Sequence, residues 1–293
     1  MNHSTYVLMT AARNERRHMD HLINSVRAQT LRPLCWVIVS DGSTDGTDEL
    51  IKQRLAEEPY IRYVRIEPER RQPGFAGKVC ALECAGAILD QMDWDYIGNL
   101  DADVMFDANY YEQLVQRLDA HPAIGIAGGY VHEWRSGRFR DRPCNRDDYV
   151  AGAVQMFRCA CFRDVGGYER LRYGGEDTVA MMKASMRGWV VRAYPDLVVR
   201  HMQHGSIKRG VVRDLFREGA MRQALGSHPA YELAKCARRA MTAPYVIGGV
   251  IRWCGYVWPL ISGQHRVVDH EFVHQFRHQQ MAKLKHFVFS SAF

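Results

Sequence analysis

The first half of the chain alternates short apolar runs with segments whose apolar residues recur at helical spacing. The short runs YVLMTA, CWVIVS, YVRIE and YIGNL are typical of buried β-strands. Between and after them, helices are predicted at RRHMDHLINSVRAQT, at ELIKQRL, along a face marked by Cys80, Cys84 and Ile88, and over 110–118. This alternation predicts a parallel sheet that helices cover.

The pattern becomes mixed after residue 125. The runs IGIAGGYV, VAGAVQMFRCACF, WVVRAYP and LVVRH predict further strands, and GGEDTVAMMKASMRG predicts a helix. The composition changes near Gly205, and VVRDLFREGAMRQAL beyond it has the pattern of a basic amphipathic helix. Because 293 residues are long for one core but short for two full domains, we predict an α/β domain over 1–205 and a basic, partly amphipathic helical region over 206–293.

The most apolar window covers 241–262 and approaches the length of a membrane span. It contains Arg252, Pro244 and Pro259, whereas a spanning helix needs about 20 largely uninterrupted apolar residues. Two interpretations stay open for it: an interfacial or re-entrant membrane segment, and a buried helical hairpin.

Charge is distributed unevenly along the chain. The formal net charge is +6, and the stretch from Gly205 to the end has 13 Lys or Arg against 5 Asp or Glu. A basic tail indicates an anionic partner such as a membrane surface, although a solvated basic face would have the same composition. A nucleic-acid partner is not expected, since no base-reading motif accompanies the tail.

The eight cysteines include no CxxC pair. Cys159 and Cys161 suit opposite faces of a strand better than a zinc site. Scattered cysteines, with no visible signal peptide, predict a reduced protein in the cytoplasm, with a peripheral position on the cytoplasmic face of the membrane as a further expectation.

Acidic residues follow three of the predicted strands. The first strand ends at Arg13-Asn14-Glu15, the second at Asp41, and YIGNL at Asp101 and Asp103. Parallel sheets bind ligands beyond the carboxyl ends of their strands. Two carboxylates one residue apart repel each other unless a cation is near, and Mg²⁺ or Mn²⁺ binds both carboxylates and phosphates. Asp-Ala-Asp therefore indicates a metal–diphosphate site, with a hydrogen-bonded turn that caps the next helix as the alternative.

Three motifs occur in a familiar order: VSDGSTDGT over 39–47, LDADV over 100–104 and GGEDTVAMMKA over 174–184. Together with TAARNE at the first strand end, they resemble glycosyltransferase family 2, the inverting sugar-nucleotide transferases. The resemblance covers roughly residues 5–205. It implies the GT-A fold, a mixed and mostly parallel central sheet, with the C-terminal helical region as an appendage.

The resemblance also implies a role for individual residues. The nucleotide-binding set would be Ala11, Arg13, Glu15, Asp41, Arg71, Lys78 and Asp101. One acid of the family's usual pair is replaced, because this chain has Ser40-Asp41. The metal ligands would be Asp103 and His201, with His204 as the alternative to His201. Asp177 would be the catalytic base with Glu176 in support, and the acceptor side would include Trp134, Gly174 and Gly175.

The predicted activity is a metal-dependent inverting transfer of one sugar from a nucleoside-diphosphate sugar, with UDP the first expectation for the nucleotide. The acceptor would be a saccharide or a lipid-linked hydroxyl in polysaccharide or glycolipid biosynthesis, and the cofactor Mn²⁺ or Mg²⁺. Two alternatives are a haloacid-dehalogenase-type phosphatase, which also uses Asp-x-Asp with Mg²⁺, and a non-catalytic, membrane-bound scaffold with a transferase-like fold.

Overall fold

A computed structural model describes residues 4–135, 137–202, 210–241, 244–264 and 266–290, with side chains described up to residue 285. The chain divides into two compact units. The first contains Met1–Arg170 and Glu176–His204, and the second contains Leu171–Gly175 and Gly205–Phe293. Each unit is described on its own below.

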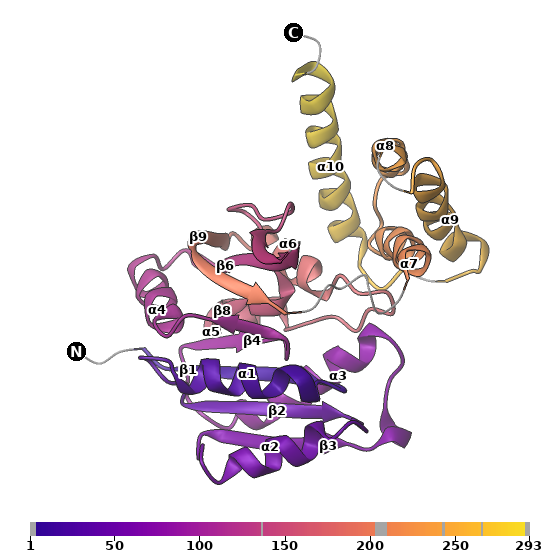
Figure 1. The fold of residues 1–293 in the computed structure, drawn as a ribbon. Helices are drawn as coiled ribbons and strands as arrows, with labels where there is room; N and C mark the ends of the chain where they lie inside the picture. The colour runs from indigo at the N-terminus through magenta and orange to yellow at the C-terminus, as the bar shows by residue number, and fades with distance from the viewer. Residues whose placement is uncertain (1–3, 136, 203–209, 242–243, 265, 291–293) are drawn as a thin grey trace. The chain divides into compact units, whose positions relative to one another are not determined.

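The first unit is built on a mixed sheet, drawn from indigo to orange in Figure 1. Its strand order is β3-β2-β1-β4-β8-β6-β9-β5, and β7 pairs with β6. Neighbouring strands are parallel from β3 to β4 and between β6 and β9, and antiparallel elsewhere. The strands are β1 (Tyr6–Ala12), β2 (Cys35–Asp41), β3 (Ile61–Ile66), β4 (Tyr96–Asn99), β5 (Val104–Phe106), β6 (Ile124–Arg135), β7 (Arg138–Asp141), β8 (Met156–Arg158) and β9 (Val190–His201).

Helices cover both faces of this sheet, because alternate residues along each buried strand point to opposite sides. On one face, Leu8 and Ile38 join a core with α1, α2 and α4. On the other, Met9 and Val37 join a core with α3, α5 and α6. The helices are α1 (Arg16–Arg27), α2 (Thr47–Leu55), α3 (Phe75–Leu89), α4 (Tyr110–Ala120), α5 (Cys159–Val165) and α6 (Glu176–Met186), with 3₁₀ turns η1 (Pro68–Arg70) and η2 (Gly152–Val154).

The α/β prediction and the parallel N-terminal half of the sheet are confirmed. Helix α1 buries the four apolar residues that its spacing singled out, Met19, Leu22, Ile23 and Val26. Helix α3 exists, but the predicted face is wrong by one position. The buried residues of α3 are Gly77, Val79, Ala81, Leu82, Ala85 and Leu89. Cys84 and Ile88 are only partly buried against the same core.

Two predictions of strands were wrong. The run VAGAVQMFRCACF contains only the short strand β8, preceded by η2 and followed by helix α5. Cys159 and Cys161 therefore lie in the first turn of α5 and not on a strand. The runs WVVRAYP and LVVRH form one strand, β9, whose pairing with β6 has an irregularity between Gly129 and Tyr130.

The described part of the second unit is helical, coloured orange to yellow in Figure 1. Helix α7 packs extensively against α9, and α9 also packs against α8. Among the residues described, no helix is both long and apolar enough to cross a membrane. The helices are α7 (Val211–Ala224), α8 (Pro229–Ala240), α9 (Ile247–Ile261) and α10 (His270–Ser290).

Candidate active site

The loops that follow β1 and β2 are joined by hydrogen bonds. The backbone N–H of Glu15 donates to Thr47 Oγ1 at 2.9 Å, and that of Arg16 donates to Asp45 Oδ2 at 3.1 Å. In return, Thr44 N–H donates to Asn14 Oδ1 at 2.9 Å. These contacts hold the carboxyl ends of two neighbouring parallel strands together, where a ligand of such a sheet binds.

Asp41 is the last residue of β2, and its carboxylate accepts a hydrogen bond from Arg71 Nε at 3.1 Å. A glycine makes room for this carboxylate: a Cβ at Gly77 would lie 3.1 Å from Asp41 Oδ2 and 2.7 Å from the Gln72 carbonyl oxygen. The structure thus brings together two of the residues that the family resemblance assigned to the nucleotide. Of the others, Ala11 lies near the end of β1, Arg13 is exposed just after it, and Glu15 is half-buried at the start of α1.

Lys78 connects three elements of the first unit. It lies in the first turn of α3, and its Nζ is 2.7 Å from Asp101 Oδ1 and 3.6 Å from Glu176 Oε1. Asp101 follows β4, and Glu176 is the first residue of α6. A cation at a helix N-terminus is electrostatically unfavourable by itself, so the two carboxylates account for its position there.

The charges in this cluster alter each other's titration. Burial lowers the pKa of Lys78, but the carboxylates of Asp101 and Glu176 outweigh burial and hold that pKa above its ordinary value. Burial raises the pKa of Glu176, Lys78 opposes that rise, and the charge of Asp177 adds to it, so the net shift is upward.

Asp177 lies in the first turn of α6. Its Oδ1 accepts a hydrogen bond from the N–H of Thr178 at 2.7 Å, and its Oδ2 accepts one from the hydroxyl of Tyr149 at 3.2 Å. The backbone at Gly152 passes so close that a Cβ there would be 3.0 Å from Asp177 Oδ2. This carboxylate has a defined orientation, as a general base requires.

Two residues that support Asp177 were not predicted from the sequence. Tyr149 precedes η2 in a polar loop, and no spacing in the sequence indicates a link to residue 177. Gln155 is fully buried; its Nε2 donates to the carbonyl oxygens of Val150 at 3.2 Å and Asp177 at 3.4 Å, and its Oε1 accepts from Tyr168 at 2.9 Å. The sequence offered one signal: Gln155 is a polar residue within an apolar run, and a polar side chain buried in such a run needs hydrogen-bond partners.

Asp103 directly precedes β5, and His201 is the last residue of β9, where its register partner in β5 is Val104. His201 Nε2 is 3.2 Å from Asp103 Oδ2, and both side chains are largely buried. Burial raises the pKa of Asp103, but the hydrogen bond and charge of His201, together with the charges of His18 and Lys78, outweigh burial and lower that pKa below its usual range. Burial lowers the pKa of His201, while Asp103 reverses the shift, so this pKa is raised.

This pair fits a divalent metal in its donor types. One carboxylate and one imidazole suit Mn²⁺, and the buried Nδ1 of His201 has no hydrogen-bond partner among the described residues. No cluster of three His, Cys, Asp or Glu residues able to hold an ion occurs in the described ranges. The alternative ligand His204 lies outside the described residues.

The three residues assigned to the acceptor side lie in different units, Trp134 in the first and Gly174 with Gly175 in the second. Trp134 is 47% exposed near the end of β6 and packs edge-to-face on Phe139 of β7, with ring centroids 5.0 Å apart. Gly174 and Gly175 have φ angles of 89° and 98°, which glycine adopts readily. A Cβ at Gly175 would lie 3.2 Å from both Leu225 Cδ1 and Met221 Sδ, so packing within the second unit also requires glycine there.

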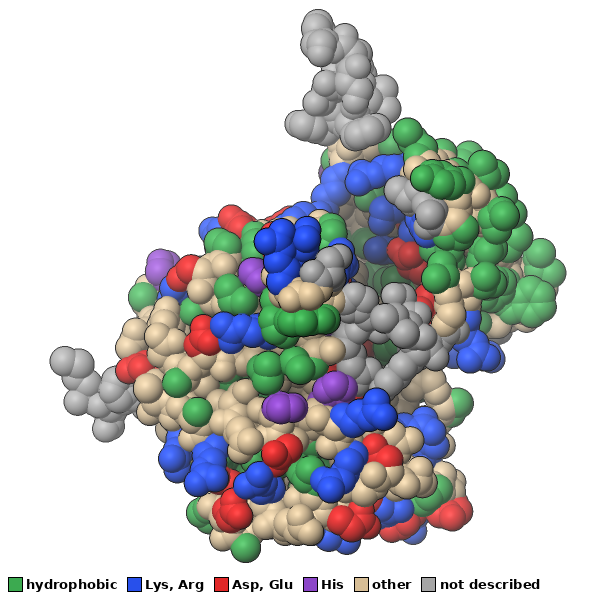
Figure 2. Space-filling model, in the orientation of Figure 1, with side chains coloured by type: hydrophobic (Ala, Val, Ile, Leu, Met, Phe, Trp, Pro, Cys, Tyr) green, Lys and Arg blue, Asp and Glu red, His purple; other side chains and the backbone are tan. Residues whose placement is uncertain are grey.

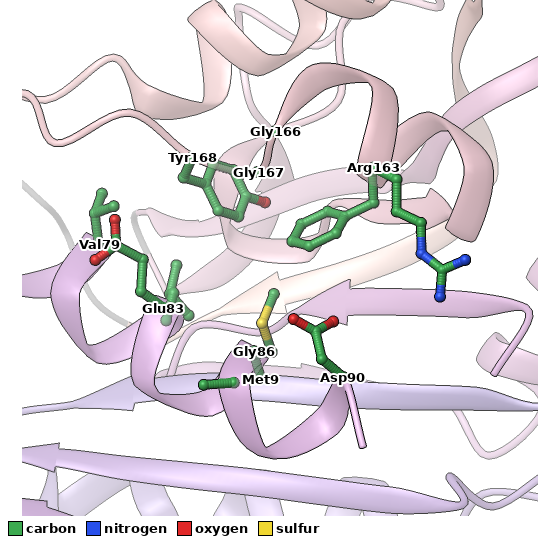
Figure 3. Close-up of a pocket in the computed structure, with 12 residues that line it drawn as sticks. Met9, Val79, Glu83, Gly86, Asp90, Arg163, Gly166, Gly167 and Tyr168 are labelled. Atoms are coloured by element: carbon green, nitrogen blue, oxygen red, sulfur yellow. The ribbon is translucent and has the colours of Figure 1, made fainter. Parts of the chain in front are cut away.

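A cavity of about 330 Å³ lies on another part of the first unit (Figure 3). Its walls come mainly from α3 and from the end of α5 with the residues after it, and include Met9, Val79, Glu83, Arg163 and Tyr168. None of the acidic residues described above lines it. Tyr168 connects the cavity to the site, because its hydroxyl donates a hydrogen bond to Gln155, which in turn donates one to the Asp177 carbonyl oxygen.

A partly parallel sheet with acidic residues at its strand ends, close to a helix that begins with two acids, is typical of the GT-A fold. Comparison with known structures agrees. A mannosyltransferase from Pyrobaculum calidifontis in complex with GDP-Man and Mn²⁺ superimposes with a TM-score of 0.57 at 16% identity, covering 100% of this chain and 82% of the other. TarS 1–349 of S. aureus in complex with UDP gives 0.55 at 12% identity, covering 90% and 94%. The predicted fold class is therefore confirmed.

The chain belongs to glycosyl transferase family 2, whose family model matches residues 8–157. A curated relative, the succinoglycan biosynthesis protein ExoA of Rhizobium meliloti (strain 1021), is 29% identical over 71% of this chain and 69% of its own length. The poly-beta-1,6-N-acetyl-D-glucosamine synthase of Staphylococcus aureus (strain COL) is 23% identical over 64% of the chain, which spans about half, 47%, of that synthase. The protein is a glycosyltransferase, and the phosphatase alternative is wrong.

Proposed function

We propose that this glycosyltransferase moves one sugar, with inversion, from a nucleoside-diphosphate sugar to an acceptor hydroxyl in polysaccharide or glycolipid assembly. The observation that carries the proposal is the cluster in which Lys78 contacts Asp101 and Glu176, with Asp177 next along α6. Carboxylates from a strand end and a helix start, with a cation between them, supply the groups that a single displacement needs.

In the proposed mechanism, Asp177 takes the proton of the acceptor hydroxyl while that oxygen attacks the anomeric carbon, and the bond from this carbon to the donor's phosphate oxygen breaks to release the nucleoside diphosphate. The hydrogen bond from Tyr149 orients the receiving oxygen, and Glu176 supports the cluster without acting as the base. When the donor binds, Lys78 gives up its contact with one carboxylate and contacts the diphosphate. Its positive charge and its position at the start of α3 suit contact with an anion. Asp41 and Arg71 hold the nucleoside, together with Ala11, Arg13 and Glu15, and Asp101 faces the ribose.

We assign the divalent cation, Mn²⁺ or Mg²⁺, to Asp103 and His201. When bound, such an ion supplies positive charge for the departing diphosphate. The two residues leave coordination positions for phosphate oxygens and water, as hard divalent ions require. The Mn²⁺ in the complex of the Pyrobaculum mannosyltransferase supports this assignment.

The donor nucleotide is proposed to be UDP, with GDP as the alternative. UDP and UDP-GlcNAc complexes of TarS support the first, and the GDP-Man complex of the mannosyltransferase supports the second. The acceptor is proposed to be a saccharide or a lipid-linked saccharide, which the names of the succinoglycan and poly-N-acetylglucosamine relatives support. The 206–293 region would then be a helical appendage to the catalytic domain.

The proposed place of the reaction is the cytoplasm, at the cytoplasmic face of the membrane. All eight cysteines are free, and Cys35, Cys161 and Cys236 are buried. Unpaired cysteines in this number support a reducing compartment.

The test is nucleoside-diphosphate release from a panel of UDP-, GDP- and dTDP-sugars, with Mn²⁺ and a lipid extract as the acceptor source. Asp177→Asn is the matched variant, since it keeps the size of the side chain and one oxygen to accept from the Thr178 N–H while it removes the base. We expect release from one donor by the wild type and loss of at least about a hundredfold in the variant. Release from no donor, or equal release by the variant, would refute the proposal; equal release would also restore the scaffold interpretation.

A further inference from the structure

Helix α9 exposes large apolar side chains along one face. The exposed residues follow helical spacing, with steps of three or four residues, so they form a single stripe. The stripe is called the α9 face below and consists of Ile247, Val250, Cys254, Trp258 and Ile261. Four of these side chains are 49% to 76% exposed.

The opposite face of α9, which packs against α7 and α8, has the more polar and smaller residues. Its buried members include Gly248, Gly249, Arg252, Gly255 and Tyr256. Arg252 forms ion pairs with Glu232 at 2.8 Å and Glu218 at 2.6 Å. A soluble helix normally turns its apolar side inward and its polar side to water. Helix α9 has the opposite arrangement, with its apolar side exposed and its only charged residue buried. Its outer face is therefore better suited to an apolar environment than to water.

Apolar exposure continues beyond the stripe itself. The segment that leads into α9 exposes Met241 at 77% and Tyr245 at 67%, and α8 exposes Leu233 at 56%. Figure 2 shows the hydrophobic side chains gathered over α8 and α9. Contiguous apolar surface of this kind marks an interaction site and not scattered surface residues.

Along the sequence of this surface, the charges have one sign. Residues 233–268 contain five Lys or Arg and not one Asp or Glu. Arg252 is buried in its ion pairs, while Arg238 near the end of α8 and Arg266 beyond α9 are exposed. An apolar centre with basic borders complements an anionic lipid surface, where acyl chains lie beneath negative headgroups.

A second copy of the chain suits this face less well. A two-fold interface would place the same acid-free, basic borders against each other, and like charges would then meet. Trp258 and Tyr245 also belong to the residue types that concentrate at membrane–water interfaces. The 15 residues of α9 extend about 22 Å, less than a bilayer core, so the helix suits a position in the plane of the interface.

We propose that the α9 face docks on an anionic lipid bilayer with the helix parallel to the membrane surface. Ile247, Val250, Trp258 and Ile261 enter the boundary of the acyl region, and Arg238 and Arg266 contact headgroup phosphates. The buried Arg252 stays in its ion pairs and takes no part in lipid contact. The inference rests on the second unit alone and is independent of the donor chemistry.

The experiment is sedimentation of the full chain with vesicles of phosphatidylcholine alone and of an equal mixture of phosphatidylcholine and phosphatidylglycerol. Val250→Asn with Ile261→Asn removes two apolar contacts from the α9 face. The matched control is Leu34→Asn with Val190→Asn, two exposed apolar residues of the first unit at 46% and 41%. All four sites are at least two-fifths exposed, and a thermal melt checks that each variant folds.

We expect the wild type and the control to bind mixed vesicles, and the α9 double variant to bind at least about tenfold more weakly. Arg238→Gln with Arg266→Gln should lower affinity for mixed vesicles by roughly fivefold per arginine, with no effect on neutral ones. Wild-type protein left in the supernatant with mixed vesicles would overturn the proposal. Equal binding by the α9 variant would do so too, as would a stable dimer that this variant dissociates.

The result is separable from the test of catalysis. Vesicle binding is measured without a donor, and nucleoside-diphosphate release is measured with detergent-dispersed acceptor and without vesicles. Release of nucleoside diphosphate without binding to mixed vesicles would refute the proposed docking surface but not the proposed function. A chain that binds mixed vesicles through the α9 face but releases nothing refutes the proposed function alone.

Discussion

Removal of the charge of Glu232 should destabilise the helical unit strongly. This carboxylate is fully buried, pairs with Arg252 at 2.8 Å and accepts a hydrogen bond from Ser227 Oγ at 2.7 Å. Loss of one partner from a buried ion pair costs about 3–5 kcal/mol, because the other charge stays buried. In Glu232→Gln, Arg252 keeps Glu218, whose side chain is 38% exposed, so we expect the lower end, about 3 kcal/mol.

The measurement is urea denaturation of the full chain, followed by tryptophan fluorescence. Trp253 and Trp258 both lie in α9 and report on this unit. The control is Glu218→Gln, which removes the exposed partner of the same arginine and should cost no more than about 1 kcal/mol. The reasoning is refuted if Glu232→Gln unfolds within about 0.5 kcal/mol of the wild type, or if the control costs more than the test variant.

The same pair predicts a pH dependence with a defined sign. Burial raises the pKa of Glu232, but its hydrogen bond and charge interaction with Arg252 outweigh burial and lower that pKa below its ordinary value of 4.5. A carboxyl group with a depressed folded-state pKa stabilises the fold above the ordinary pKa, and this contribution is lost as the pH falls through the folded-state value. The stability difference between wild type and Glu232→Gln should therefore be full at neutral pH and shrink below about pH 4.5.

Three predictions concern the catalytic unit. Asp177→Asn should lower kcat about a thousandfold and leave the thermal shift produced by UDP with Mn²⁺ unchanged, because the base is not part of the donor site. Tyr149→Phe should lower kcat about tenfold at an unchanged KM for the donor; a change in KM alone would mean that its hydroxyl does not orient the base. Asp103→Asn should raise the Mn²⁺ concentration needed for half-maximal activity at least about tenfold, and an unaltered titration would exclude Asp103 as a ligand.

The carboxyl edge of the sheet could be predicted from the sequence because an apolar run must end where its polar residues begin. Asp41 closes β2, and Asp101 and Asp103 follow β4 as expected. The sequence did not predict which basic side chain contacts each of these carboxylates. The contact of Lys78 with Glu176 spans almost a hundred positions, and it depends on how α3 and α6 pack on the same face of the sheet.

The errors have physical causes as well. The run that contains Cys159 and Cys161 is apolar enough for a strand, but it turns into a helix that packs its Cys161 and Val165 in the core beside α6. Short apolar runs do not distinguish a buried strand from a buried helix by period alone. For the 241–262 window, the sequence did not show which side of the helix is buried: α9 buries Arg252 and glycines and exposes Trp258.

The hydrogen bonds that join the loops after β1 and β2 have a consequence for redesign of the donor preference. The Asp45 carboxylate accepts hydrogen bonds from the Arg16 N–H and from the Thr47 hydroxyl. The Thr47 hydroxyl oxygen in turn accepts one from the Glu15 N–H. If only one of these loops were replaced by that of a relative that binds a different nucleotide, the hydrogen bonds to the other loop would be lost. Both loops should therefore be replaced together in a chimera, with the junctions placed inside the strands.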